Sequence, residues 1–444
     1  MGIKKTLIKN SFFNLGSYAY LLLAAFFSIP IILNSLGSDL FGIYVLLASI
    51  VPLVSVLDFG LGNAVVRDLS LPNLSKKEYI DTWRTSFLFF AAIGFVLFLF
   101  VFGFLRLIPG HWEIFRLLNT HTLNQLAWVI ALTVFFNHIN AHLLNLPQAR
   151  QQFEIFNLKT LLVGTGNTII TAVVATMTKN LADLFLIQFV FHLITFVLLV
   201  IYAKRIFSGW DFFPAFKKKT AVRLSIFGLK NFVGAVSNQV EAQASKYIIA
   251  FRASALAITA FSIPQNIILK AAGVISQVAI ALFPTGTSLL TKDRMPKLTK
   301  LILLIEGLTL VFGLAGIIGI FAFSNQFLLW WLKNPEVVGL VAPVLRVMSF
   351  YLLFTALTPI PTVVFIGLNY PQIPSLFALL TAIIEIIFLV ILVPPLQAVG
   401  AAYATVSAAA ITVPLMLLVF AHLYRKEFKK IQFPVGNATP PNLA

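Results

Sequence analysis

The sequence predicts an all-α integral membrane protein with about twelve transmembrane helices, arranged as two sets of six. Hydrophobic residues make up 59% of the 444 residues and charged residues only 11%, against about 25% charged residues in soluble domains. The mean hydropathy is +0.95. The apolar segments approach or exceed the roughly 20 residues that a spanning helix needs. Most basic residues fall in every second gap between these segments, as they do in membrane proteins of defined orientation.

The expected spans follow from the positions of the apolar segments. A closed barrel is excluded because its strands alternate over only about ten residues. In chain order the spans are 12–34, 40–63, 85–108, 122–146, 155–178, 182–203, 224–251, 255–290, 299–323, 338–367, 373–394 and 397–424.

The first six spans are interrupted only by short polar gaps. Span 12–34 follows a basic start, and its apolar stretch is too long for the core of a signal peptide, so we expect it to be retained as a helix. In the second set, spans 255–290 and 338–367 are long and contain prolines, so we expect kinks or extensions past the membrane. These prolines are Pro264, Pro284, Pro343, Pro359 and Pro361.

The basic residues predict the orientation. Twenty-three Lys and Arg residues lie at the N-terminus, in the even-numbered gaps and in the tail, and five lie in the odd-numbered gaps. We therefore expect both termini to be cytoplasmic, with the basic loops attracted to anionic membrane lipids. Nucleic acid is not an expected partner, because the charge is scattered over short loops.

The connection with the most Lys and Arg residues, 204–223, divides the chain into two halves. We expect an N-terminal six-helix lobe over 1–210, a C-terminal six-helix lobe over 211–430 and a disordered cytoplasmic tail over 431–444. Six is an even number, so the halves enter the membrane in the same direction, as parallel repeats do. KNSFFNLGSYAY in the first half resembles KNFVGAVSNQVE in the second, although apolar helices also resemble one another by composition.

Ionisable residues inside spans are costly and usually face a bundle interior or a hydrated cavity. Asp58 lies at the inner end of the second span. The others are all in the second half of the chain: Lys230, Glu241, Lys246, Lys270, Glu306, Arg346 and Glu385.

Helical periodicity groups some of these residues into two polar stripes. One stripe, in span 224–251, contains Asn231, Gly234, Asn238, Glu241 and Ser245. The other, in span 255–290, contains Ser262, Gln265, Asn266, Lys270, Gly273, Ser276 and Gln277. We interpret the stripes as the lining of a cavity; the alternative is a polar seam between two helices. Lys246 lies off the stripe and is expected to reach the outer membrane surface.

Signatures of enzymes, metals and cofactors are missing. The chain has no Cys, no P-loop and no GxSxG motif. His138 and His142 lie one helical turn apart, but no acidic or Cys partner is spaced with them, so polar packing is favoured over a metal site. We therefore expect no enzymatic activity, no metal and no cofactor.

Three segments resemble the polysaccharide flippases of the multidrug/oligosaccharidyl-lipid/polysaccharide exporter superfamily. They are LGSDLFGIYVLLASIVPLVSVLDFGLGNAVVRDLS (36–70), LPQARQQFEIFNLKTL (146–161) and the last helical pair, which begins VFIGLNYPQIPSLFALL and continues VPPLQAVGAAYATVSAA. The first resembles the signature of the family's first hairpin, including Gly37, Gly42, Tyr44, Asp58 and Arg67. With the twelve spans, the resemblance covers the whole chain.

The resemblance implies two six-helix lobes around a central cavity, working by alternating access in a bacterial inner membrane. It implies an undecaprenyl-pyrophosphate-linked oligosaccharide as cargo, such as a lipopolysaccharide or capsule repeat unit, and other polysaccharide-assembly proteins as partners. The lipid II branch is disfavoured, because span 12–34 has no charge and the two extra helices of that branch are missing. A cation-coupled multidrug-type exporter of the same superfamily is the alternative.

An anionic cargo also suits the intramembrane cations. We expect the substrate to be bound by Lys230, Asn231, Asn238, Gln265, Asn266, Lys270 and Arg346. Glu241 and Asp58 are the candidates for a coupling or ion-pairing role, with Glu241 expected to face Lys270.

Overall fold

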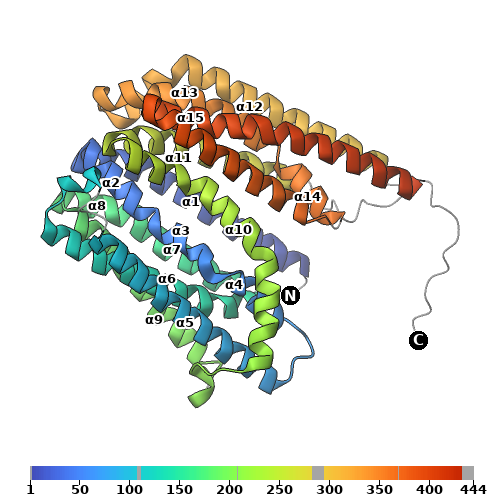
Figure 1. Cartoon of the computed structure of the whole chain (residues 1–444). Helices are drawn as coiled ribbons and strands as arrows, with labels where there is room; N and C mark the ends of the chain where they lie inside the picture. Colours follow the sequence, from blue (N-terminus) through green and yellow to red (C-terminus); the bar gives the residue numbers. More distant parts are fainter. Residues whose placement is uncertain (1–2, 108–111, 208, 283–294, 369, 433–444) are drawn as a thin grey trace.

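The computed structural model describes residues 3–107, 112–207, 209–282, 295–368 and 370–432, and its helices form two lobes (Figure 1). The first lobe contains α1 (Ile3–Leu36), α2 (Ser38–Ala48), α3 (Ile50–Ser55), η1 (Val56–Asp58), α4 (Leu61–Leu69), α5 (Lys76–Leu107), η3 (Glu113–Leu117), α6 (Thr120–Ala149), α7 (Phe153–Thr165), η4 (Gly166–Ile170), α8 (Thr171–Thr178) and α9 (Leu181–Lys204). After η5 (Gly209–Phe212), the second contains α10 (Lys218–Arg252), α11 (Ala255–Leu282), α12 (Met295–Leu332), α13 (Pro335–Ala356), α14 (Pro359–Gly367) and α15 (Gln372–Gln432).

The expected membrane spans correspond to these helices. Among the described residues, ten helices are long and apolar enough to cross a membrane. One of them, α15, consists of two helices, because the backbone at Gln397 leaves the helical region after Pro394 and Pro395. Thr381 and Thr412 are hydrogen-bonded at 2.8 Å, so the two parts of α15 lie side by side. The polar α10 is helical over its full length as well.

The second span does not continue as a regular helix. After η1, Phe59 and Gly60 both have positive φ, and the chain restarts as α4, a short helix that the sequence did not predict. The Asp58 carboxylate accepts hydrogen bonds from the backbone N–H groups of Gly60 (2.9 Å) and Gly62 (3.2 Å). Asp58, two residues before the N-cap Gly60, thus accepts a hydrogen bond from one of the free backbone N–H groups in the first turn of α4.

Two further breaks have local causes. The expected kink in span 338–367 is confirmed: α13 ends at Ala356 and α14 starts at Pro359, whose ring cannot continue the preceding helix. A π-helical turn, η4, separates α7 from α8 and places Asn167 within the lobe. Pro284, for which a kink was also expected, lies outside the described residues.

The lobes contact one another closely at the end where α2 begins, which the basic loops predict to be the external end. Gly42 of α2 packs against α11 so closely that a Cβ would lie 2.0 Å from the Ala255 carbonyl oxygen. Beside it, the Thr259 hydroxyl donates to the Ser38 carbonyl (2.6 Å). Only glycine permits so close an approach. One core of buried apolar residues accordingly continues from α1 and α2 into α11 and α13.

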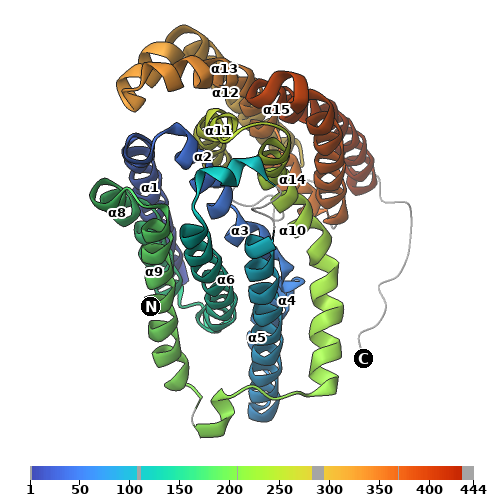
Figure 2. The same ribbon diagram turned by 60° about the vertical axis from the view of Figure 1, so that its left-hand side comes forward.

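At the opposite end, α10 extends along the first lobe beside α4 and α5 (Figures 1 and 2). A Cβ on Gly60 would lie 2.3 Å from the Gly228 carbonyl oxygen. The segment before α10 is bound to α5 as well, because Trp83 Nε1 donates to the Phe212 carbonyl (3.1 Å) and Arg84 Nε to the Phe213 carbonyl (2.9 Å). The chain that connects the lobes is therefore docked on the first lobe.

Candidate functional site

A pocket of about 230 Å³ lies between the two lobes. Residues of α1, α2, α3 and η4 line it from the first lobe, and residues of α10 and α11 line it from the second. Its lining, all within the described residues, includes two cations, Lys246 and Lys270, and no acidic residue. We call it the inter-lobe pocket.

The two lysines come from neighbouring helices. Lys270 is half-buried on α11, one turn after Asn266, which lines the same pocket. Lys246 is 9% exposed on α10, and its Nζ donates to Gln243 Oε1 (2.7 Å). The expectation that Lys246 reaches the outer surface is therefore wrong. Gln243 and Lys246 share a face of α10 that the polar stripe did not include, and this face is turned towards the first lobe.

Glu241 and Asn238 occupy a different pocket. It has a volume of about 260 Å³ and lies within the second lobe, where hydroxyl groups of α13, α14 and α15 dominate its polar lining. The Tyr351 hydroxyl donates to Glu241 Oε1 (2.9 Å). Glu241 forms no ion pair with any described residue and does not face Lys270 as expected, because the two side chains line pockets on different sides of α10.

A second buried carboxylate lies near Glu241. Glu385 is 1% exposed and accepts hydrogen bonds from the hydroxyl groups of Ser245 (3.0 Å) and Thr405 (2.7 Å). These bonds connect α10 with both parts of α15. Neutral hydroxyl donors, rather than cations, thus satisfy both carboxylates in this part of the second lobe.

The remaining candidates lie at several places. Gln265 is buried, and its Nε2 donates to the Ala242 carbonyl of α10 (3.3 Å). Gln265 therefore belongs to a polar contact between α10 and α11, which was the alternative to a cavity lining. Arg346 Nε donates to the Ser324 hydroxyl (3.2 Å), which joins α13 to α12. Asp58 accepts hydrogen bonds from backbone N–H groups at the start of α4. Lys230 and Asn231 were also expected to bind substrate, but their side chains are not among those that the structure describes.

His142 of α6 packs among aromatic rings, and His138 contacts the Val134 carbonyl of its own helix (3.2 Å). His142 is fully buried, with ring centroids 4.3 Å from Trp83 and 5.0 Å from Phe87. Within the described part of the chain, no group of three or more His, Cys, Asp or Glu residues is placed to hold a metal ion. The packing interpretation therefore fits His142.

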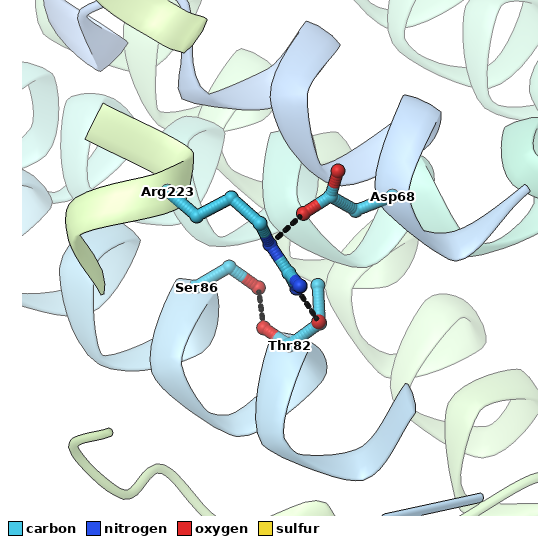
Figure 3. Close-up of polar contacts among 4 residues, drawn as sticks. All are labelled: Asp68, Thr82, Ser86 and Arg223. Carbon is cyan, nitrogen blue, oxygen red and sulfur yellow. Dashed lines mark hydrogen bonds and ion pairs between the residues drawn. The ribbon is translucent and has the colours of Figure 1, made fainter. Parts of the chain in front are cut away.

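An ion pair that the sequence did not predict joins α10 to the first lobe (Figure 3). Arg223 Nε lies 2.8 Å from Asp68 Oδ2 of α4, and Arg223 also donates to the Thr82 hydroxyl of α5 (3.0 Å). The Asp68 side chain is only 4% exposed. The available signal was a single acid in LGNAVVRDL, a run whose other polar residues are Asn63 and Arg67.

Comparisons with known proteins agree with this architecture. A family model described as "Polysaccharide biosynthesis protein" matches residues 7–290. A solved lipid II flippase, MurJ, in an inward closed conformation has a TM-score of 0.75 at 15% identity, covering 96% of this chain and 90% of that one. A search of curated protein sequences finds no match.

Two multidrug resistance transporters of the MATE family in the MOP superfamily, each 13% identical, differ in conformation. The inward-facing structure has a TM-score of 0.71 and covers 95% of this chain and 96% of its own. The outward-facing structure has a TM-score of 0.58, with 93% and 96% covered. The lobe arrangement of this chain is therefore more similar to the inward-facing form.

Proposed function

Because this chain belongs to the polysaccharide biosynthesis protein family, we propose that it is a flippase for a lipid-linked oligosaccharide. The proposed cargo is an undecaprenyl-pyrophosphate-linked repeat unit of lipopolysaccharide or capsule, moved from the inner to the outer leaflet of the bacterial inner membrane. The matched solved structures are a flippase and transporters, which supports transport rather than enzymatic chemistry. Both termini are proposed to be cytoplasmic.

The observation that carries this proposal is the charge of the inter-lobe pocket. Lys246 and Lys270 line it together, and its described lining contains no acid. Cations held inside a membrane protein are costly unless they meet an opposite charge, and a pyrophosphate would supply one. The amide of Asn266 adds a hydrogen-bond donor beside Lys270. A pocket with this charge suits an anionic headgroup.

The position of the pocket suits alternating access. It lies between lobes that are in close contact at the end where Gly42 meets Ala255. If that end is external, a cargo taken from the cytoplasmic leaflet leaves only after this contact opens. Moving negative charge outward also runs down an inside-negative potential, by about 2.3 kcal/mol per charge per 100 mV.

A cation-coupled multidrug-type exporter is the second candidate. The observation in its favour is the second-lobe pocket, where the Glu241 carboxylate lies among hydroxyl groups. The inter-lobe pocket argues against it, because two lysines repel an organic cation.

The experiment is translocation in proteoliposomes that carry a labelled undecaprenyl-pyrophosphate oligosaccharide. We expect the wild-type protein to move the label across the bilayer and the double variant Lys246→Gln, Lys270→Gln to reduce the initial rate at least roughly tenfold, the effect of losing a charge-assisted contact. Lys77→Gln, an exposed position on α5, serves as the matched control and should keep the wild-type rate. Transport of an organic cation but not of the sugar lipid would favour the exporter. Wild-type rates in the double variant would contradict the role of the pocket.

A further inference from the structure

A third cavity, of about 370 Å³, lies within the first lobe among α2, α3, α6, α7, η4 and α9. It shares Tyr44, Ala48, Pro52 and Asn167 with the lining of the inter-lobe pocket. The two cavities therefore adjoin, with Tyr44 and Asn167 at their boundary. The volume falls within the range of about 300–1,000 Å³ that is usual for small-molecule pockets.

The lining of this first-lobe pocket is polar but uncharged. Besides Tyr44, its polar members are Ser55, Thr133, Asn137, Asn167, Gln188 and His192, and none of the described residues that line it is Asp, Glu, Lys or Arg. This differs from the inter-lobe pocket, which is cationic. A ligand that extends from one into the other would have a charged part and a neutral, hydrogen-bonding part.

Some of these polar groups are already satisfied by the protein. Gln188 Nε2 donates to the Tyr44 hydroxyl (3.0 Å) and contacts the Thr171 hydroxyl (3.3 Å). The hydroxyls of Ser55 and Thr133 donate to backbone carbonyls of their own helices. Such groups hold the wall in place and need no ligand.

Two others are not satisfied. Asn167 Oδ1 and His192 Nδ1 are buried, and neither has a hydrogen-bond partner among the described residues. His192 is only 4% exposed. An unpaired buried polar atom costs about 1–3 kcal/mol, so native proteins usually provide it with a partner. Both residues line this cavity, so a ligand bound there is the candidate partner.

The chemistry of the wall indicates what that partner is. Amide and imidazole groups both donate and accept hydrogen bonds, which matches hydroxyl groups that do the same. The rings of Tyr44 and Phe185, with centroids 5.6 Å apart, add flat apolar surfaces to the same wall. Hydroxyl groups around an uncharged ring with apolar faces are the features of a sugar. A pyrophosphate would find no cation in this pocket, and an organic cation would find no acid.

We propose that the first-lobe pocket binds a neutral sugar ring of the cargo through Asn167 and His192, while the pyrophosphate lies at Lys246 and Lys270. This inference rests on the proposed function and adds the position of the glycan. The pocket would then select among cargoes by their sugar, because the inter-lobe lysines meet a pyrophosphate common to all of them.

Binding to the purified protein in nanodiscs tests the proposal. The probes are undecaprenyl pyrophosphate and its conjugates with glucose, galactose and N-acetylglucosamine, titrated separately. At least one conjugate should bind roughly tenfold more tightly than the sugar-free lipid, the equivalent of one or two neutral hydrogen bonds. His192→Phe should reduce this ratio to within about twofold while the affinity for the sugar-free lipid stays unchanged, and Asn167→Leu should reduce the ratio to the same extent.

Further variants separate binding from folding. Removing an unpaired buried group relieves a cost, so Asn167→Leu should not lower the melting temperature of the ligand-free protein. His192→Gln keeps a donor and an acceptor and should retain most of the sugar preference. Lys270→Ala should lower the affinity for sugar-bearing and sugar-free lipids to the same extent.

Different binding results would contradict the sugar site and the proposed function. Equal affinity of the wild-type protein for the sugar-free lipid and all three conjugates would overturn the sugar site and leave the anion site intact. No binding of any of the four lipids would overturn both. A lower melting temperature for Asn167→Leu, with the sugar preference kept, would make Asn167 structural and would also contradict the proposal.

Discussion

At the scale of single residues, four intramembrane charges of the second lobe differ in their surroundings according to sign, whereas Arg346 bonds Ser324 within the lobe and the Glu306 carboxylate has no hydrogen-bond partner among the described residues. The acids Glu241 and Glu385 accept hydrogen bonds from hydroxyl groups inside the lobe. The cations Lys246 and Lys270 line the pocket between the lobes. A buried charge is tolerated when hydrogen bonds satisfy it or when a charged ligand does. Glu241 and Glu385 are thus hydrogen-bonded within the protein, and Lys246 and Lys270 line the pocket proposed for the cargo.

We predict that Glu241 takes up a coupling proton while it holds Tyr351. Glu241→Gln keeps an acceptor for the Tyr351 hydroxyl, so the protein should accumulate normally. Glu241→Ala leaves that hydroxyl unpaired and should lower stability by about 1–3 kcal/mol. In proteoliposomes loaded with the sugar lipid, both variants should lose the pH dependence of transport. Denaturation of the purified variants measures the stability difference.

The control for this prediction is Tyr351→Phe, which removes the hydrogen bond and keeps the carboxylate. It should retain pH-dependent transport. If Glu241→Gln responds to pH like the wild-type protein, the coupling role is wrong and Glu241 is structural only.

At the scale of elements, α10 determines how the lobes are connected. Its N-terminal part packs on α4 and α5, and its C-terminal part packs on α15 and α11. One face carries Glu241 and Ser245 towards the second lobe, and another carries Gln243 and Lys246 towards the first. Polar side chains on more than one face explain why α10 is less apolar than the other long helices: most of its surroundings are protein rather than lipid.

We predict that the Asp68–Arg223 pair stabilises the docking of α10 on the first lobe. Arg223→Ala leaves Asp68 buried without its cation, and because Arg223 is partly exposed we expect a loss of about 1–3 kcal/mol. The double variant Asp68→Asn, Arg223→Gln removes both charges and should recover part of this loss. Thermal unfolding of the purified variants in one detergent gives the comparison.

Lys219→Ala is the matched control, since Lys219 is exposed on α10 one turn before Arg223. It should unfold at the wild-type temperature. Additive effects of the Asp68 and Arg223 substitutions in a double-mutant cycle would show that the pair contributes no coupling energy, contrary to this prediction.

At the scale of the whole molecule, the arrangement of the lobes is that of one conformational state. The contacts of Gly42 with α11, and of Trp331 Nε1 with the Phe26 carbonyl (2.9 Å), lie at the end predicted to be external. Under the proposed alternating access, these contacts would separate while the inter-lobe pocket stays between the lobes. The proposal therefore places the opening at these contacts, and the distribution of basic residues predicts to which side it opens.

We predict that the linker between the lobes faces the cytoplasm. The sequence contains no Cys, so a single introduced Cys can be labelled without background. Trp210 is 80% exposed in this linker. Trp210→Cys should stay unlabelled by an impermeant thiol reagent in intact cells and react after permeabilisation, because 23 of the 32 basic residues lie in the segments predicted to share the cytoplasmic side with the linker.

A Cys at Arg116, in the exposed η3 loop on the opposite side, is the positive control and should react in intact cells. Ready labelling of the Cys at position 210 in intact cells would reverse the predicted orientation.

The sequence by itself determined the helices and the class of protein. Hydrophobic length and the spacing of basic residues act locally along the chain, so the long segments, the break before Pro359 and the two helices within α15 could all be predicted. The signature around Gly42 and Asp58 indicated the family for the same reason, because its residues are contiguous. The division into lobes at about residue 210 and the orientation stay predictions from these patterns.

Only the tertiary structure decided which polar residues meet. Helical periodicity places residues on a face but does not say which neighbour that face contacts, and α10 has neighbours on several sides. Lys246 therefore lies with Lys270 between the lobes, Glu241 lies with Tyr351 inside the second lobe, and Gln265 joins two helices. Asn167 and His192 reach one cavity from separate helices. Such sites are assembled from distant segments by packing, which leaves no local pattern in the sequence.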